Sequence, residues 1–315
     1  MYFFKLIRPL NLSIIALTMY GLGVFFETIY SKNEIFGTES LPFILLVFST
    51  VLIAAGGNII NDYFDIKADR INKPERQIIG VHIKRRSAIV SHWIINFIAF
   101  SIAVYLSWVM DSFLYVFIHL FSINVLWYYS MKGKRQFLFG NILIAALTAL
   151  VPALVGLYYH QIFENEVPQM DQFSFLLNSE IHYIYYLTIG LGIFAFILNL
   201  AREIVKDMED VEGDRKLPAK TLPIILGLQK SKYISALILS GVSICTLYIG
   251  LTTSNLTTKE ILPVIISLLI VVLCIILLLV SKNKKDFKRI NGFIKVAMAF
   301  GLLTPIYWTI LLHYV

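Results

Sequence analysis

Two rows of aspartate with the same spacing lie far apart in the sequence. They are Asp62, Asp65 and Asp69 in the first row and Asp207, Asp210 and Asp214 in the second. Residues at positions i, i+3 and i+7 lie on one face of an α-helix. Each row therefore predicts a stripe of carboxylates along a helix. If both helices end on the same side of the protein, the two stripes can face each other across a common cavity.

Like charges stacked on one helical face are unfavourable unless a cation binds them. Two carboxylates about 6 Å apart repel by roughly 2.8 kcal/mol at an effective dielectric constant of ~20. Carboxylate and amide oxygens are hard ligands that suit Mg²⁺ rather than zinc, so Mg²⁺ is the predicted cofactor. Towards the apolar segments, the rows continue with Asn58, Glu203 and Asn199, which we expect to orient the ligands. The alternative interpretation is that these acids are solvated helix ends.

Basic side chains surround both acidic rows. The basic residues that we select as candidate ligands for an anion are Arg8, Arg76, Lys132 and Lys206; we add the neutral Asn11, and Tyr128 one helical turn before Lys132. Mg²⁺ is usually held by one or two carboxylates together with substrate phosphates. A diphosphate bound by metal ions and cations is therefore the predicted ligand, although each basic residue alone is more typical of a membrane anchor.

The elements that position these residues are apolar helices. The chain has 315 residues, of which 58% are hydrophobic and only 15% charged, with a mean hydropathy of +0.75. A bilayer core needs about 20 residues of helix, and nine stretches approach that length. We place them near residues 7–28, 41–60, 87–109, 111–130, 137–159, 181–205, 231–253, 261–281 and 291–313. This composition excludes a soluble enzyme, a disordered chain and a disulfide scaffold, and it predicts an all-α bundle with a central cavity.

The distribution of basic residues predicts the orientation. All of the 27 Lys and Arg residues except Lys32 and Lys259 fall in the N-terminal segment or after the even-numbered spans. By the positive-inside rule that side is cytoplasmic, and the acidic rows are on it. We therefore expect a multi-pass protein of the cell membrane, with its N-terminus and its active site towards the cytoplasm. The net charge of +7 then reflects topology and membrane lipids, and no nucleic-acid partner is expected.

The two acidic rows also suggest an internal repeat. They are offset by 145 residues and each continues an even-numbered span. We interpret the chain as a single domain, residues 1–315, with pseudo-repeat halves of about 1–135 and 136–315. Repeats and intramembrane acids also occur in cation-coupled transporters, so a transporter is the alternative of a different class. Protein partners cannot be deduced from these patterns.

A diphosphate beside apolar helices suggests a lipid tail, and an isoprenyl diphosphate is the natural candidate. Metal ions that neutralise the diphosphate let the allylic bond to oxygen break. The site must then exclude water, which would quench the resulting cation. These requirements predict a prenyl transfer between a diphosphate donor and a lipid-soluble acceptor.

Several motifs together resemble the UbiA superfamily of intramembrane prenyltransferases. They are NDYFDIKAD with RINKPER, DMEDVEGDRK with KTLP, RPLN near the N-terminus, and YYSMKGKR. In this resemblance the first family motif falls on Asn61, Asp65 and Asp69, and the second on Asp210 and Asp214. The third falls on Tyr128 and Lys132. The resemblance implies an all-α fold and a Mg²⁺-dependent prenyl transfer in which Asp65, Asp69, Asp210, Asp214, Tyr128 and Lys132 are the catalytic residues.

Within the superfamily, the motifs are most similar to members that make an ether lipid. The resemblance implies transfer of a geranylgeranyl group to the hydroxyl of geranylgeranylglyceryl phosphate. The resemblance adds Asn61 to the metal ligands, whereas Asp62 and Asp207 are predicted metal ligands from the spacing of the two rows. An aromatic acceptor, such as a quinone or tetrapyrrole precursor, is the alternative.

Overall fold

The computed structural model describes residues 2–30, 37–72, 74–166, 179–216, 218–252 and 258–314. In these ranges the chain is helical, and the only other pairing is one isolated β-bridge between Ile79 and Ile83. The elements are α1 (Tyr2–Ile7), α2 (Pro9–Tyr30), α3 (Leu41–Asn72), η1 (Pro74–Arg76), α4 (Arg85–Val109), α5 (Leu114–Met131), η2 (Gly133–Arg135), α6 (Phe139–Glu166), α8 (Ser179–Arg215), α9 (Leu222–Leu226), α10 (Leu228–Thr252), α11 (Thr258–Val280), α12 (Lys284–Leu302) and α13 (Thr304–Tyr314).

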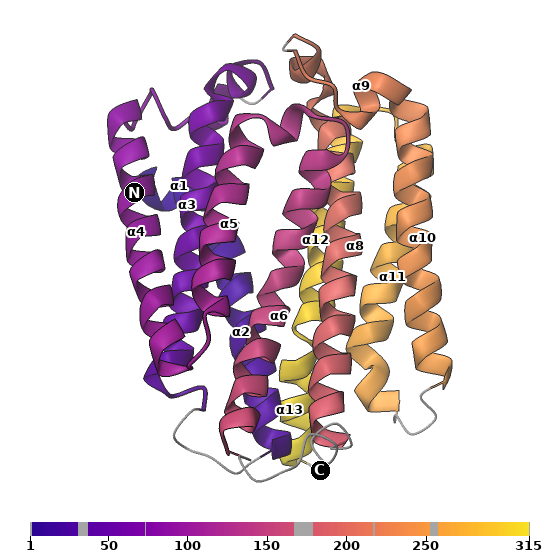
Figure 1. Ribbon diagram of the computed structural model, residues 1–315. Coiled ribbons are helices and arrows are strands. Elements are labelled where there is room, and N and C mark those ends of the chain that lie inside the picture. The colour runs from indigo at the N-terminus through magenta and orange to yellow at the C-terminus, as the bar shows by residue number, and fades with distance from the viewer. Residues whose placement is uncertain are drawn as a thin grey trace.

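The long helices run side by side along the height of the molecule (Figure 1). In the described part of the chain, nine segments are long and apolar enough to cross a membrane, which confirms the predicted number. Large apolar side chains point outwards, with Trp108 80% exposed and Leu237 73% exposed. Such a surface would be unfavourable in water but suits lipid. The all-α bundle predicted from composition is therefore confirmed.

The second and sixth spans are much longer than predicted. We placed their ends at residues 60 and 205, but α3 continues to Asn72 and α8 to Arg215. The apolar run alone underestimates these helices because the charged residues that follow it also adopt helical conformation. Both acidic rows therefore lie on continuous helices, as their spacing predicts.

The first and last spans are interrupted. Arg8 has a left-handed backbone (φ 57°) and separates α1 from α2. Near the C-terminus, α12 begins at Lys284, before the predicted residue 291, and ends at Leu302. Pro305 has no amide N–H and cannot continue the α-helical hydrogen bonds across this point, so α13 starts as a new helix at Thr304.

The ends that carry the acidic rows lie together. In Figure 1 the end of α3, the connection from α5 to α6 and the short helix α9 all occupy the upper end of the bundle, whereas the C-terminus is at the opposite end. Two apolar clusters stabilise the bundle below them. One includes Phe26, Phe43 and Tyr158, and the other includes Leu198 and Ile294.

Candidate active site

The two acidic rows face the interior of the bundle. All six aspartates are half-buried, whereas Lys67 and Glu212 on the same helices are exposed. Across the gap between the helices, the charge of Asp65 on α3 acts on Asp214 on α8, together with that of neighbouring Asp210. The two rows therefore share one electrostatic environment, as expected from their spacing.

A lysine that the sequence analysis did not select joins the rows. The Lys134 ammonium group on the η2 turn forms an ion pair with Asp65, and both side chains are largely buried. The same ammonium group acts electrostatically on Asp214. Lys134 thus places a positive charge where two carboxylates from different helices would otherwise repel each other. This is the position in which a bound metal cation would have the same effect.

The first row is also tied to the N-terminal helices. Arg8 donates a hydrogen bond to Asp62 Oδ1 at 2.5 Å. One helical turn deeper, Asn58 Nδ2 donates to the carbonyl oxygen of Ile7 at 2.9 Å. These contacts explain why the chain bends at Arg8, since the bend brings its guanidinium group to α3. Asn58 therefore holds the backbone of this bend. Its expected role of orienting the metal ligands stays a prediction.

On the second row, Asp207 has a partner from α6. Asn141 is buried and donates a hydrogen bond through Nδ2 to Asp207 Oδ2 at 2.8 Å. An amide donor holds one carboxylate oxygen and leaves the other available for a second ligand. Asn141 was missed in the sequence analysis because nothing in its local pattern distinguishes it from a helix residue near the membrane surface.

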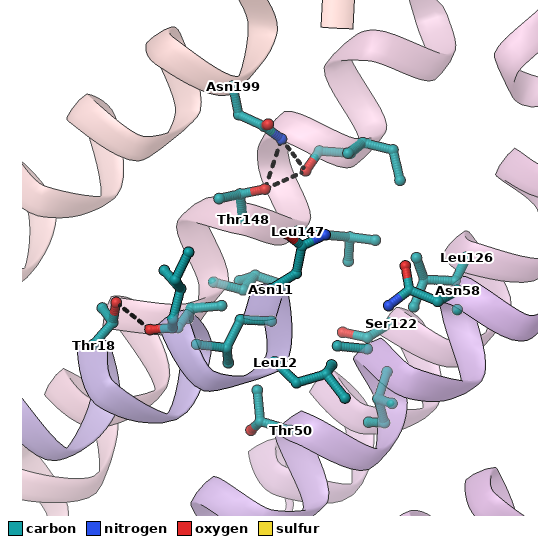
Figure 2. Close-up of a pocket in the computed structure, with 18 of the residues that line it drawn as sticks. Asn11, Leu12, Thr18, Thr50, Asn58, Ser122, Leu126, Leu147, Thr148 and Asn199 are labelled. Carbon is teal, nitrogen blue, oxygen red and sulfur yellow. Dashed lines mark hydrogen bonds between the residues drawn. The ribbon is translucent and has the colours of Figure 1, made fainter. Parts of the chain in front are cut away.

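Below the rows lies a cavity of about 310 Å³. Its upper wall is polar and contains Arg8, Asn11, Asn58 and Asn61. The remainder is mostly apolar, with Leu12, Leu126, Leu147, Ile14, Ile15, Ile53, Val151, Leu154, Met298 and Leu302 among the lining residues. Figure 2 shows how Asn11 and Leu12 of α2 approach Leu147 of α6 across this space. A polar head and an apolar tail can thus be accommodated together.

A buried ionic network forms another part of the cavity wall on α8. Glu203, only 3% exposed, forms ion pairs with Arg202 and, at 3.0 Å, with Lys206. The Tyr129 hydroxyl donates to Glu203 Oε2 at 3.4 Å. Arg202 also donates to Asn199 Oδ1 at 2.9 Å. Arg202 is thus paired with an acid, and Glu203 itself borders the cavity.

Asn199 links this network to α6. Its Nδ2 group donates to Thr148 Oγ1 at 2.7 Å and to the Ile144 carbonyl oxygen at 3.3 Å, as Figure 2 shows. Asn199 is buried, and these hydrogen bonds fix the orientation of its amide. Its expected role of orienting other groups agrees with its contact to Arg202.

The structure places the third predicted motif differently from the sequence analysis. Lys132 is exposed and caps the C-terminal end of α5, where its amide still donates to the Tyr128 carbonyl oxygen at 2.9 Å although its own backbone angles are non-helical. The Tyr128 hydroxyl contacts the side chain of Gln136 instead of the cavity. The helix ends before Gly133, and this turn brings Lys134 to the carboxylates. Tyr129, which follows Tyr128 in the sequence, lines the cavity.

Two further predicted positions can be described only in part. Arg76 ends the η1 turn, but its side chain lies outside the described part of the structure, as does the whole of Lys73. Asp69 is half-buried on α3, in line with the rest of its row. The expected contribution of Arg76 to an anion site therefore stays a prediction.

The donor set fits a metal ion that is completed by a substrate. In the described ranges, no group of three or more His, Cys, Asp or Glu side chains converges closely enough to hold a metal ion by itself. Mg²⁺ seldom uses an all-protein cage and takes substrate phosphates as further ligands. The paired carboxylates around Lys134 supply hard oxygen atoms of that kind. The geometry thus fits a cation shared between the protein and a phosphate-bearing ligand.

These features define an intramembrane protein with a carboxylate-lined polar site above an apolar cavity. The sequence profile of the UbiA prenyltransferase family matches residues 14–310. The chain therefore belongs to the UbiA prenyltransferase family.

Relatives within the family have a common name. The digeranylgeranylglyceryl phosphate synthase of Thermococcus gammatolerans is 37% identical over 194 residues, covering 61% of this chain and 60% of that protein. The chain thus matches somewhat less than two thirds of that relative. The protein of the same name from Methanothermobacter thermautotrophicus is 30% identical over 306 residues, covering 96% of this chain and 93% of its own.

Solved structures share the fold. One, concerning digeranylgeranylglyceryl phosphate synthase in membranes, has a TM-score of 0.65 at 24% identity and covers 98% of both chains. Another, a UbiA homolog from Archaeoglobus fulgidus bound to GPP and Mg²⁺, has a TM-score of 0.58 at 16% identity. It covers 96% of this chain and 99% of the other.

Proposed function

We propose that this prenyltransferase transfers a geranylgeranyl group from its diphosphate to the hydroxyl of geranylgeranylglyceryl phosphate. The observation that carries the proposal is the position of two inward-facing carboxylate rows directly above a largely apolar cavity. The name shared by the relatives supports the choice of acceptor. The product is an ether lipid with two isoprenoid chains.

The proposed cofactor is Mg²⁺. The residues that would hold it are Asn61, Asp65 and Asp69 on α3 and Asp210 and Asp214 on α8. Asp62 and Asp207 flank these ligands. When bound, the metal neutralises the diphosphate leaving group. The Archaeoglobus fulgidus homolog, which binds GPP and Mg²⁺, supports this cofactor.

The chain's own side chains account for the other requirements. Lys134 and Arg8 add positive charge beside the acidic rows, where the diphosphate oxygens gain negative charge as the bond to carbon breaks. The apolar lining below receives the isoprenoid chain and excludes water from the carbocation. The buried hydrogen bond from Asn141 keeps Asp207 oriented before the substrate binds.

We further propose that the site opens on the cytoplasmic side of the cell membrane. The basic segments that carry Lys134, Arg135 and Lys220 lie at the same end of the bundle as the acidic rows (Figure 1). Positive residues of this kind are retained in the cytoplasm during insertion. Reaction with a membrane-impermeant lysine reagent in oriented vesicles tests this orientation.

The deciding experiment uses purified protein with labelled geranylgeranyl diphosphate and a panel of acceptors. The panel contains geranylgeranylglyceryl phosphate and aromatic acceptors, and products are identified by mass. We expect the ether lipid alone, with no product in EDTA and recovery on adding Mg²⁺. Prenylation of an aromatic acceptor instead would overturn the acceptor assignment.

Three isosteric variants test the site. Asp65→Asn and Asp210→Asn each remove one charge from a row and should abolish transfer without preventing membrane insertion. Glu212→Gln is the matched control, because Glu212 lies on α8 but is exposed and points away from the cavity. Wild-type activity in either aspartate variant would refute the role of the rows.

A further inference from the structure

Lys295 is a charged residue inside the last membrane span. It is the twelfth residue of α12, about 16 Å along the axis from the start of that helix. It lines the cavity and is exposed there. Ionisable residues in membrane spans are costly and usually belong to a functional site. Neither the sequence analysis nor the family motifs select it.

No carboxylate neutralises Lys295. In the described part of the chain its ammonium group makes no hydrogen bond or ion pair, whereas Arg8 pairs with Asp62. The groups that act on it electrostatically are Arg202, Lys206, Arg8 and, with opposite sign, Glu203. Three of these four neighbours carry its own charge.

The cavity wall consequently has an excess of positive charge. Among the described lining residues the cations are Arg8, Arg202, Lys206 and Lys295, and the one carboxylate is Glu203. Even when Asp62 is counted against Arg8, the lining has two more cations than carboxylates, and only Lys206 among them also interacts with Asp207 and Asp214 of the second row. Cations gathered at low dielectric without counter-charges are unfavourable. A dianionic ligand is the simplest group that would balance them.

This basic group lies deeper than the acidic rows. Arg202 precedes Asp207, the first aspartate of the second row, by five residues, which corresponds to about 7.5 Å along α8, whereas Lys206 directly precedes Asp207. Since α12 packs beside α8 (Figure 1), Lys295 belongs to this inner level. Arg202 and Lys295 thus lie below the level at which the rows and Lys134 would hold the donor diphosphate, and Lys206 lies at the border between the two levels.

The surroundings of Lys295 also indicate what is attached to the anion. Met298 and Leu302 follow at i+3 and i+7, so they share its helical face, and both line the cavity. A phosphate on Lys295 can therefore continue into an apolar chain along α12. This combination suits a phosphate monoester that carries a lipid tail.

We propose that Lys295, with Arg202 and Lys206, binds the phosphate of the acceptor lipid. The proposal rests on the proposed function, because geranylgeranylglyceryl phosphate has a phosphate on the carbon next to the one bearing the reactive hydroxyl. Anchoring that phosphate at the inner level directs the hydroxyl towards the allylic carbon below the donor diphosphate. Lysine and arginine bind phosphate through charge-assisted hydrogen bonds.

The test separates the two substrates kinetically. Lys295→Met keeps the length of the side chain and removes its charge, and it leaves no buried carboxylate unpaired. A lost hydrogen bond to a charged group corresponds to about 10- to 100-fold in affinity. We expect KM for the acceptor to rise by that factor while KM for the donor stays within about twofold. An unchanged acceptor KM, or an equal rise for the donor, would overturn the proposal.

The matched control is Lys288→Met. Lys288 lies two turns earlier on the same face of α12, is exposed and does not line the cavity. It should leave both KM values unchanged. If it raises the acceptor KM as much as Lys295→Met does, the effect comes from general surface charge and the proposal fails.

A binding measurement distinguishes failure of this inference from failure of the proposed function. The probe is a short-chain monoalkyl glycerol phosphate, titrated calorimetrically without any donor, with the corresponding monoalkyl glycerol as reference. Wild-type protein should prefer the phosphate form, and Lys295→Met should lose that preference. This result decides the role of Lys295 even if the wild-type protein makes no ether lipid. Equal preference in both proteins would refute it.

Discussion

Gly140 controls the position of Lys134 although it touches no substrate. It is the second residue of α6 and packs against the η2 turn. A Cβ atom at this position would lie 2.6 Å from the Gly133 carbonyl oxygen and 2.8 Å from the Lys134 Cα atom. Both contacts are with backbone, which cannot rotate away as a flexible side chain would. Gly140→Ala must therefore displace the turn or the start of α6.

The size of the displacement follows from these distances. Ordinary van der Waals contact begins near 3.4 Å, so the carbonyl oxygen must move by about 0.8 Å. The turn is also held from its other side, because the Lys220 amide donates to the Arg135 carbonyl oxygen at 2.8 Å. Misplacing a substrate-positioning group by about 1 Å can cost up to about 100-fold in rate. We expect a loss of 10- to 100-fold in prenyl transfer.

The assay compares initial rates of prenyl transfer and melting temperatures in detergent. Overpacking of this kind destabilises a protein by about 1–3 kcal/mol, so Gly140→Ala should still fold. The matched control is Gly241→Ala on α10, where an added Cβ has no neighbour within 4 Å. If Gly140→Ala transfers the prenyl group as fast as Gly241→Ala and with an unchanged donor KM, then prenyl transfer does not depend on the present position of Lys134. That result would refute the role assigned to this turn.

Three further substitutions probe the ionic contacts. Glu203→Gln leaves Arg202 and Lys206 without their buried counter-charge and should lower the free energy of unfolding by about 3–5 kcal/mol. An unchanged melting temperature would contradict this stabilising role of Glu203. Lys134→Met should reduce prenyl transfer at least tenfold because it weakens donor binding, which is measured as donor KM. An increase in acceptor KM alone would contradict the placement of Lys134 at the acidic rows. Asn141→Ala removes the hydrogen bond to Asp207 of the second row and should lower the rate of prenyl transfer about tenfold with little change in expression. A fully active variant would show that this hydrogen bond is not needed to orient Asp207.

Local patterns in the sequence were sufficient for the bundle and the acidic rows. Apolar length predicts each membrane helix because a span must satisfy its own backbone hydrogen bonds inside lipid. The spacing of Asp62, Asp65 and Asp69 predicts a shared face because helical periodicity depends only on neighbouring residues. Arg8 and Asn11, selected from the sequence, both line the cavity, and their binding of an anion stays a prediction.

The tertiary structure alone decided which polar side chains from distant segments meet. Lys134 lies 69 residues from its partner Asp65, and Asn141 lies 66 residues from Asp207. No periodicity connects such pairs, because their contact depends on where each helix ends and on how the helices pack. Lys295 became significant only when packing placed it among other cations instead of beside a carboxylate.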